Sequence, residues 1–349
     1  MKKILSTCTL LIGIALSSFG QIGGQHTFDF LNLTPSARLT AIGGTNVSLR
    51  DDDPVMAYEN PALLNDSMDN WVAVSYAPYL AGIKYGYSGY AKTIDKVGYV
   101  HGSVKYFNSG RQQGADAFGN LTNTFSSNEA VVTVGYARPI GLTNIHVGSN
   151  LKFIASNLAP GFSATGLALD LGASYLSDSG LFSAGLVFKN LGIQTSTYSA
   201  NGSREPLPLQ IVAGVSNKLK YMPLRFSMTL THLEHWDLVY DDPNAEIELD
   251  FNGNPIDNSP GVADRIARHM VFGGEFLLGK SLRLRVGYNH LRRQELRSQN
   301  RAGMSGFSLG VGIRANRKGF AFDYGYSSLG SAGLFNAHQF SLRYRIKRK

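Results

Sequence analysis

Apolar and polar residues alternate with a period of two along most of the chain, starting at Trp71. This period is typical of β-strands, because successive side chains of a strand point to opposite faces. In residues 281–289 the leucines, the valine and the tyrosine share one face, and the arginines, the glycine and the asparagine share the other. The pattern predicts about fourteen strands, near residues 71–79, 83–91, 97–107, 128–138, 145–156, 164–177, 182–190, 209–217, 225–232, 269–278, 282–289, 307–315, 320–326 and 337–346.

The polar faces of these strands decide between a soluble sandwich and a membrane barrel. A soluble β-sandwich also alternates, but it turns its apolar faces inward, and its strands are shorter than those predicted here. The polar faces in this chain carry charges and many glycines, which suit a crowded and curved lumen wall. Aromatic residues near strand ends suit the two membrane interfaces; they are Tyr76, Tyr79, Tyr90, Tyr106 and Phe107. We therefore predict an all-β fold: a transmembrane antiparallel β-barrel.

The connections between the predicted strands support the same fold. If the first strand runs outward, the connections on the periplasmic side are about three to seven residues long, as expected for outer-membrane barrels. Most connections on the other side are much longer; they cover residues 108–127, 191–208, 233–268, 290–306 and 327–336. A soluble sandwich has no reason to alternate short and long connections in this way.

The first twenty residues indicate export. Lys2 and Lys3 precede an apolar stretch and then Ser18-Phe19-Gly20, which is typical of a bacterial secretory signal cut before Gln21. The sole cysteine, Cys8, lies inside this signal, so the mature chain is expected to have neither a disulfide nor a cysteine metal site. After the signal there is no run of about 18 apolar residues, so we predict no transmembrane helix. A closed barrel is the other way to span a membrane, because it pairs every backbone group between strands.

The chain is basic, with a formal net charge of +8, and removing Lys2 and Lys3 leaves +6. The basic residues are spread over alternate strand positions and several loops rather than gathered in one stripe. We therefore expect no nucleic acid partner. For an envelope protein the anionic neighbours are lipopolysaccharide and acidic glycans.

Residues 21–70 do not follow the strand pattern. The sequence GQHTFDFLNLTPSARLTAIGG has only a partial helical period, and it ends at Gly43-Gly44, where a helix is expected to break. Asp51 to Pro54 form a predicted turn. Asn60-Pro61-Ala62 favours extended backbone before the proline and a short helix after it.

This stretch resembles the N-terminal region of the PorV/PorQ group of FadL-like outer-membrane barrels, and it is closer to the PorQ branch of the type IX secretion system. The matching residues are Phe30-Leu31, Leu33, Ser36-Ala37-Arg38, Ala41, Gly43-Gly44, Asp51 to Asp53 and Asn60-Pro61-Ala62. The resemblance implies three parts: a signal peptide (1–20), an N-terminal plug that folds into the lumen (21–70) and an outer-membrane barrel (71–349). The plug motif would comprise Ser36, Ala37, Arg38, Gly43, Gly44, Asn60, Pro61 and Ala62. The alternative for residues 21–70 is a periplasmic arm that only leads into the first strand.

The same resemblance implies a function without catalysis or cofactors. The barrel would anchor a surface partner similar to PorZ, in a complex with PorU and PorV that attaches cargo to surface lipopolysaccharide. The alternative is a FadL-like passive transporter of hydrophobic small molecules, which would need an apolar lumen. The predicted inward positions are Arg, Asp, Gly and Ser, so we favour the anchoring role.

Residue types that could carry other chemistry give weak signals. Asp250-Phe251-Asn252-Gly253 has its glycine at the wrong position for an EF-hand, and a solvated turn explains it better. His232 and His235 would point to opposite faces at a strand end, so we expect no metal there. His101, His146 and His338 lie singly on predicted strands, where lumen-wall positions are expected. No G-x-S-x-G occurs, so an esterase is not predicted.

Two basic segments carry further expectations. The predicted outer loop 290–306 contains Arg292, Arg293, Arg297 and Arg301, which could bind phosphate or carboxylate groups of lipopolysaccharide or of an acidic partner. The alternative is a loop tip whose charges only keep it soluble. The basic tail from Arg343 to Lys349 is expected at the periplasmic leaflet.

Overall fold

The computed structural model describes residues 26–79, 82–116, 118–141, 144–199, 202–239, 260–296, 303–315, 319–328 and 336–346. The predicted signal, residues 1–20, lies outside this part of the chain. Among the described residues, no helix is both long enough and apolar enough to cross a membrane.

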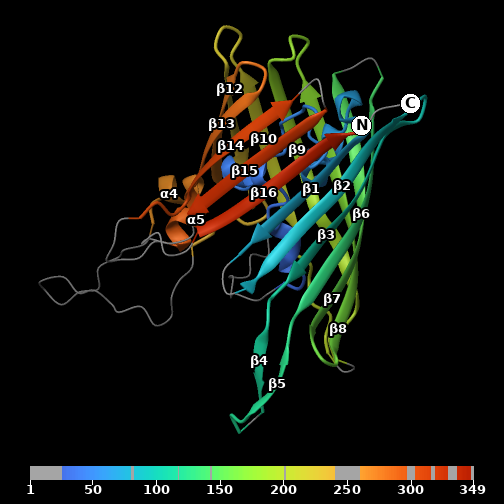
Figure 1. Cartoon of the computed structure of the whole chain (residues 1–349), viewed down its shortest axis with the longest axis vertical. Coiled ribbons are helices and arrows are strands. Elements are labelled where there is room, and N and C mark those ends of the chain that lie inside the picture. Colours follow the sequence, from blue (N-terminus) through green and yellow to red (C-terminus); the bar gives the residue numbers. More distant parts are fainter. Residues whose placement is uncertain are drawn as a thin grey trace, which may run out of the picture.

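Within the described residues, fourteen strands close into one antiparallel barrel (Figure 1). Neighbouring strands follow the chain order, and the barrel closes where the first strand pairs with the last, with Trp71 opposite Arg345. The strands are β1 (Trp71–Pro78), β2 (Lys84–Ile94), β3 (Gly98–Asn108), β6 (Asn128–Pro139), β7 (Ile145–Ala159), β8 (Phe162–Leu176), β9 (Phe182–Ser196), β10 (Gln210–Lys218), β11 (Leu224–Leu230), β12 (Met270–Leu278), β13 (Leu282–Asn289), β14 (Phe307–Ala315), β15 (Phe320–Ser328) and β16 (Asn336–Arg345). The predicted fold class is confirmed.

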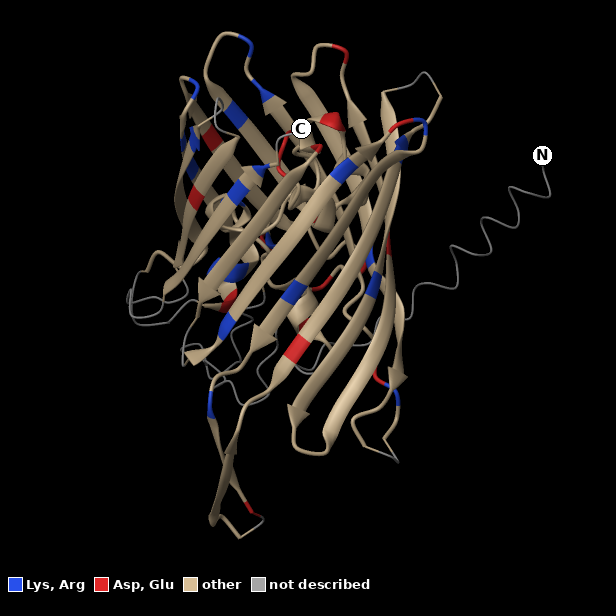
Figure 2. Ribbon diagram, turned by 45° about the vertical axis from the view of Figure 1, so that its right-hand side comes forward, with Lys and Arg blue, Asp and Glu red and all other residues tan. Residues whose placement is uncertain are grey.

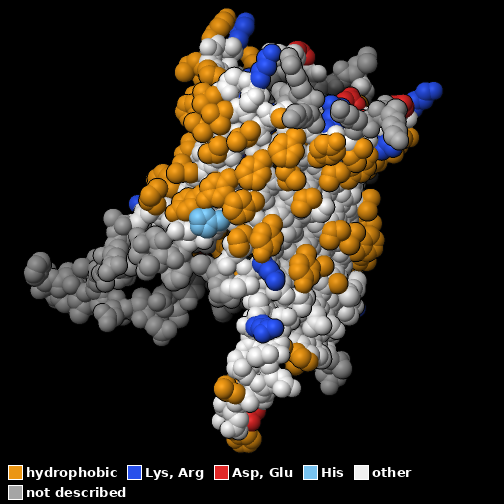
Figure 3. Space-filling view, viewed as in Figure 1, with side chains coloured by type: hydrophobic (Ala, Val, Ile, Leu, Met, Phe, Trp, Pro, Cys, Tyr) orange, Lys and Arg blue, Asp and Glu red, His pale blue; other side chains and the backbone are white. Residues whose placement is uncertain are grey.

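The strands present apolar side chains outward and polar ones to the lumen. On β15 and β16, Phe322 and Leu342 are exposed, whereas Asp323 and Arg343 are buried. In the space-filling view, hydrophobic side chains form a broad band over the middle of the strands (Figure 3). This arrangement is the reverse of a soluble protein and matches a barrel that is surrounded by lipid.

The two rims of the barrel differ in the length of their connections, as the sequence pattern predicted. One rim has tight turns, and Figure 2 shows charged residues on several of them. The other rim carries the longer connections, although the strand pairs β1–β2 and β7–β8 follow each other closely along the chain there as well. Three connections on this rim contain structure that the alternation did not predict: a two-stranded hairpin of β4 (Gln112–Ala115) and β5 (Leu121–Phe125), helix α4 (Val262–Arg268) and helix α5 (His290–Glu295).

Residues 26–70, which we call the N-terminal segment, lie inside the barrel. Their short helices are η1 (Asp29–Asn32), α2 (Ala37–Ala41), α3 (Met56–Glu59), η2 (Pro61–Leu63) and η3 (Asp66–Met68). Helix α2 contacts strands β13 to β16, and η2 contacts β6, β7 and β8, so the segment touches well-separated parts of the wall. Most of the large apolar side chains of the interior belong to this segment, including Leu39, Met56, Tyr58 and Leu63. The hydrophobic core of the described molecule is therefore in the lumen.

Candidate functional site

The interface between the N-terminal segment and the lumen wall holds most of the buried polar residues. Its first part is helix α2, which begins at Ser36. The Ser36 hydroxyl accepts a hydrogen bond from the Leu39 amide, which caps the helix. The Ala37 amide donates to Ser341 Oγ on β16 over 2.8 Å. Gly325 on β15 makes this close approach possible, because a Cβ there would lie 2.2 Å from the Ala37 carbonyl oxygen.

Gly43 and Gly44 end this helix and turn the chain. Their φ angles are +106° and +110°, a region that side-chain-bearing residues rarely adopt. Space is also restricted, because a Cβ on Gly43 would lie 2.4 Å from Val271 Cγ1. Both glycines are thus required by backbone conformation and by the nearby wall.

Asn60 holds the other end of the segment. Its Oδ1 accepts from the Ala62 amide at the start of η2, where Pro61 occupies the first helical position. Its Nδ2 donates to the carbonyls of Val47, at 2.9 Å, and Ala173 on β8, at 3.2 Å. The Ala62 carbonyl in turn accepts from Ser174 Oγ. The structure therefore places all eight residues of the predicted plug motif inside the barrel.

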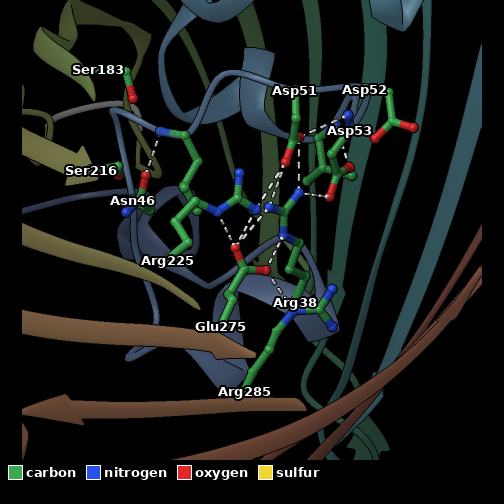
Figure 4. A network of polar contacts seen from close by, with 12 residues as sticks. Arg38, Asn46, Asp51, Asp52, Asp53, Ser183, Ser216, Arg225, Glu275 and Arg285 are labelled. Atoms are coloured by element: carbon green, nitrogen blue, oxygen red, sulfur yellow. Dashed lines mark hydrogen bonds and ion pairs between the residues drawn. The ribbon is translucent and has the colours of Figure 1, made fainter. Parts of the chain in front are cut away.

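Arg38 lies at the centre of an ion-pair network (Figure 4). Its side chain is 2% exposed, and all three guanidinium nitrogens are paired with carboxylates. Nε and Nη2 donate to the two oxygens of Glu275, on β12, over 3.1 and 3.2 Å. Nη1 and Nη2 donate to the two oxygens of Asp51 over 3.0 and 2.7 Å, and Nη1 also donates to Asp53. Two-point pairing of this kind fixes both the position and the plane of the guanidinium.

The network extends over six neighbouring strands of the wall, β11 to β16. Arg285 on β13 joins Glu275 to Asp323 on β15 over 2.8 and 2.6 Å. Arg343 on β16 donates to Asp323 over 3.0 Å and lies 3.5 Å from Asp53. Arg314 on β14 pairs with Asp52 at 2.6 Å, and Arg225 on β11 pairs with Asp51 and Glu275.

These ten side chains are balanced in charge: the network has five arginines and five carboxylates. The arginines are Arg38, Arg225, Arg285, Arg314 and Arg343, and the carboxylates are Asp51, Asp52, Asp53, Glu275 and Asp323. Burial alone would raise the pKa of Asp51, but Arg38, Arg225 and Arg314 outweigh it, so that the pKa of Asp51 lies well below its ordinary value. Asp51 therefore stays ionised, and the segment is held by charge as well as by packing.

A second polar cluster lies on the wall formed by β3, β7, β8 and β9. Lys152 pairs with Asp170 at 2.8 Å, and both side chains are fully buried. Lys189 pairs with Glu59 of the segment at 3.2 Å. Lys105 donates to the carbonyls of Leu31, at 3.0 Å, and Leu33, and it also lies over the Tyr58 ring. The segment is thus bound to opposite sides of the lumen.

The predicted partner-binding arginines are placed as follows. Arg292, on α5, donates from Nη1 to Ser327 Oγ over 2.9 Å, and its Nη2 lies against Gly44. Arg293 donates to the Gly303 carbonyl, and its guanidinium lies over the Phe307 ring. Both side chains thus contact the protein itself. Arg297 and Arg301 lie outside the described residues.

The histidines take separate positions. His101 faces the lumen near Tyr87, and His146 lies beside Arg50. His338 faces outward instead, with Nδ1 at 2.8 Å from the Tyr324 hydroxyl, so the expectation of a lumen-wall position was wrong for this residue. His232 lies 3.2 Å from Glu234. Across the part of the chain that the structure describes, there is no group of three His, Cys, Asp or Glu side chains that could hold a metal ion.

The plug motif includes Arg38, but the other charged residues of the lumen network were not predicted from it. Arg343 was expected at the membrane surface, but it is 2% exposed and lies in the lumen, because inward positions of β16 face Asp53 and Asp323. One signal was available in the sequence: charges of opposite sign occupy inward positions of successive strands. Glu275 and Arg285, for example, are direct cross-strand neighbours.

A cavity of about 400 Å³ opens at the rim with the longer connections. Its lining includes Phe28, Phe30 and Leu33 of the N-terminal segment, Phe107 and Glu129 of the wall, and Tyr198, which follows β9. This cavity, which we call the rim pocket, has several aromatic and apolar side chains in its wall.

Comparisons with known proteins give a match in structure. No protein-family model and no curated protein matches the sequence. The toluene transporter TodX of Pseudomonas putida is 12% identical with a TM-score of 0.51, over 89% of this chain and 97% of that chain. A TodX deltaS2S3 mutant, described as a monoaromatic hydrocarbon channel, is 12% identical with a TM-score of 0.52, over 89% and 99%. A FadL homologue from Pseudomonas aeruginosa is 13% identical with a TM-score of 0.49, over 90% and 99%.

The likeness to TodX shows that the fold is a FadL-like outer-membrane barrel. The FadL-like fold that the N-terminal resemblance implies is therefore confirmed. With its apolar outer face and polar lumen, the chain is an integral outer-membrane protein, as predicted. The similar structures are transporters and channels rather than enzymes.

Proposed function

We propose that the protein is a non-enzymatic barrel component of a type IX secretion system, similar to PorQ, which anchors a surface partner similar to PorZ. The observation that carries this proposal is the filled lumen. The motif residues shared with this group of barrels belong to a segment that lies in the barrel interior, where four of its charged side chains join six from the wall in one network. A barrel filled in this way suits a fixed scaffold, whose outer loops bind the partner.

A passive transporter of hydrophobic small molecules is the second candidate. The apolar walls of the rim pocket favour it, and so does the description of TodX as a toluene transporter. An apolar molecule that went further into the lumen would meet the network around Arg38, however. To pass the network it would have to separate buried arginines from their carboxylate partners. An apolar molecule offers these charges no new partner, so the separation is costly. We therefore favour the anchoring function.

Affinity purification from native envelopes in a mild detergent tests the proposal. We expect a large surface protein to be recovered with the barrel. A variant with Arg297→Glu and Arg301→Glu in the proposed partner-binding loop should recover at least tenfold less of it. The matched control, Lys218→Glu with Lys220→Glu, changes two exposed cations at the turn rim and should recover the normal amount. A barrel that is recovered without a partner but with a bound apolar molecule would favour transport instead.

A further inference from the structure

The rim pocket has an unusual combination of aromatic walls and negative charge. Its lining includes Phe28, Phe30, Phe107 and Tyr198. It also includes three carboxylates, from Asp29, Glu129 and Glu205, and one histidine, but no lysine or arginine. An apolar cavity without function would not need these carboxylates, and a pocket for a fatty acid would be expected to carry cations instead.

Glu129 is the central feature of this pocket. It is 8% exposed, at the start of β6, yet no lysine or arginine of the described chain lies within ion-pair distance of it or of Asp29 and Glu205. Lys105, on the neighbouring strand, gives its ammonium to the carbonyls of Leu31 and Leu33 instead. In the lumen network every carboxylate has an arginine partner, so a buried carboxylate without a cation stands apart.

The carboxylate of Glu129 is held in place by a chain of hydrogen bonds. Ser156 Oγ donates to Glu129 Oε1 over 2.8 Å, and the Tyr198 hydroxyl donates to Ser156 Oγ over 2.9 Å. Thr27 extends this chain to the N-terminal segment, and its amide also donates to the Pro206 carbonyl over 3.0 Å. The Tyr198 ring packs against Phe28 with a centroid separation of 6.3 Å. The pocket is therefore fixed from both the segment and the wall.

We propose that the rim pocket binds an organic cation with an apolar body, that is, an ammonium or guanidinium group on an aromatic or alkyl stem. The cation would pair with Glu129, with Asp29 and Glu205 adding attraction at the entrance. The aromatic rings would pack against the stem and attract the cation through their faces. This chemistry could come from a free amine or from an arginine or lysine side chain of a surface protein.

Binding to the purified barrel in lipid nanodiscs, measured by calorimetry, tests the site. The probes are phenethylammonium, 3-phenylpropionate and 2-phenylethanol, which share an aromatic body and differ in charge. We expect the cation to bind at least tenfold more tightly than the anion or the alcohol. Equal affinities for the three, or tighter binding of the anion, would overturn the proposal.

Glu129→Gln keeps the shape of the side chain and removes its charge, so it should weaken phenethylammonium binding at least tenfold. Asp178→Asn, an exposed change at the opposite rim, is the matched control and should leave it unchanged. If Glu129→Gln does not fold, as judged by heat-modifiable migration on a gel, Glu205→Gln in the exposed connection should weaken binding at least threefold. Unchanged affinity in the folded variant would show that these carboxylates do not bind the cation.

Two peptides separate the sources of the cation. Acetyl-Phe-Arg-Phe-amide and its citrulline counterpart have nearly the same shape, but only the first is charged. Tighter binding of the arginine peptide than of phenethylammonium would point to a protein partner, and the opposite order would point to a free amine. Because the measurement uses the barrel alone, its failure would leave the proposed secretion function standing.

Discussion

Arg38 is the one arginine that the segment contributes to the lumen network, and it joins three carboxylates. Its guanidinium pairs with Asp51 and Asp53 of its own segment and with Glu275 of the wall. A buried ion pair adds little net stability over apolar residues of similar size, but removing one partner leaves its counter-charges buried and unpaired. The role of Arg38 is therefore to fix where the segment sits, and its loss should be costly.

Replacing Arg38 by Met should lower the free energy of unfolding by about 3 to 5 kcal/mol, the usual cost of breaking a buried ion pair. Arg314→Met is the matched control, because Arg314 and its partner Asp52 are each 20% exposed and partly solvated. Its cost should be about 1 kcal/mol, as expected for pairs near solvent. Urea unfolding in lipid vesicles measures both, and equal losses would contradict the central position of Arg38.

Asp51 should make the stability depend on pH. Its pKa in the folded protein lies well below the ordinary value of 3.8, so in acid the unfolded chain binds more protons than the folded one. The stabilisation is therefore fully present above pH of about 4 and is lost as the pH falls below it. Asp51→Asn should reduce this slope between pH 2 and 5 while lowering stability at pH 7. If stability falls with pH as steeply in the variant as in the parent, other carboxylates cause the pH dependence.

Glycines on the inward faces of the strands determine how closely the segment approaches the wall. At Gly287 on β13, a Cβ would lie 2.2 Å from the Gly43 nitrogen and 2.4 Å from the Ile42 carbonyl carbon. Both atoms belong to the peptide bond that joins Ile42 to Gly43, so the obstacle is backbone of the segment rather than the end of a flexible side chain. A side chain at position 287 would therefore push the segment away from β13.

Gly287→Ala should accordingly destabilise the protein by about 1 to 3 kcal/mol, as overpacking of a core does. Gly102→Ala, on β3, is the matched control, because its Cβ would meet nothing within 4 Å. Gly102→Ala should be neutral or slightly stabilising in a strand. Thermal unfolding compares the two variants. Similar unfolding midpoints would show that the structure adjusts to a methyl group at position 287.

The strands could be predicted closely from the sequence because a barrel wall has one polar and one apolar face, as in Leu282–Asn289. The hairpin β4–β5 was missed because nearly all of its residues are exposed on both faces, which removes the alternation. The contact between Arg38 and Glu275 could not be predicted either. These residues are 237 positions apart, and their meeting depends on the path of the segment through the lumen.

Considered as one body, the molecule is a barrel whose interior belongs largely to its own N-terminal segment. Segment and wall meet at Ser48 and Ser216 of β10, where the hydroxyl oxygens lie 2.6 Å apart. Because Cys8 is the sole cysteine in the chain and lies in the predicted signal, two added cysteines can report on this contact without interference.

Ser48→Cys with Ser216→Cys should form a disulfide that ties the segment to the wall, given how close the two side chains are. If the barrel acts as a fixed scaffold, the cross-linked protein should capture its partner as well as the parent does. Thiol labelling measures the extent of cross-linking, and each single variant is a control for the substitution itself. Loss of capture that is restored by reduction would mean that the segment has to move.

The distribution of charge in the lumen network has a consequence for how the protein is assembled. The wall contributes four arginines and two carboxylates, whereas the segment contributes one arginine and three carboxylates. Within this network the share of the wall therefore carries a charge of +2, and the share of the segment carries −2. The segment leads directly into β1, which closes the barrel against β16. Placing the segment inside the barrel therefore neutralises the excess positive charge that the wall contributes to this network, so the wall and the segment depend on each other for a lumen of balanced charge.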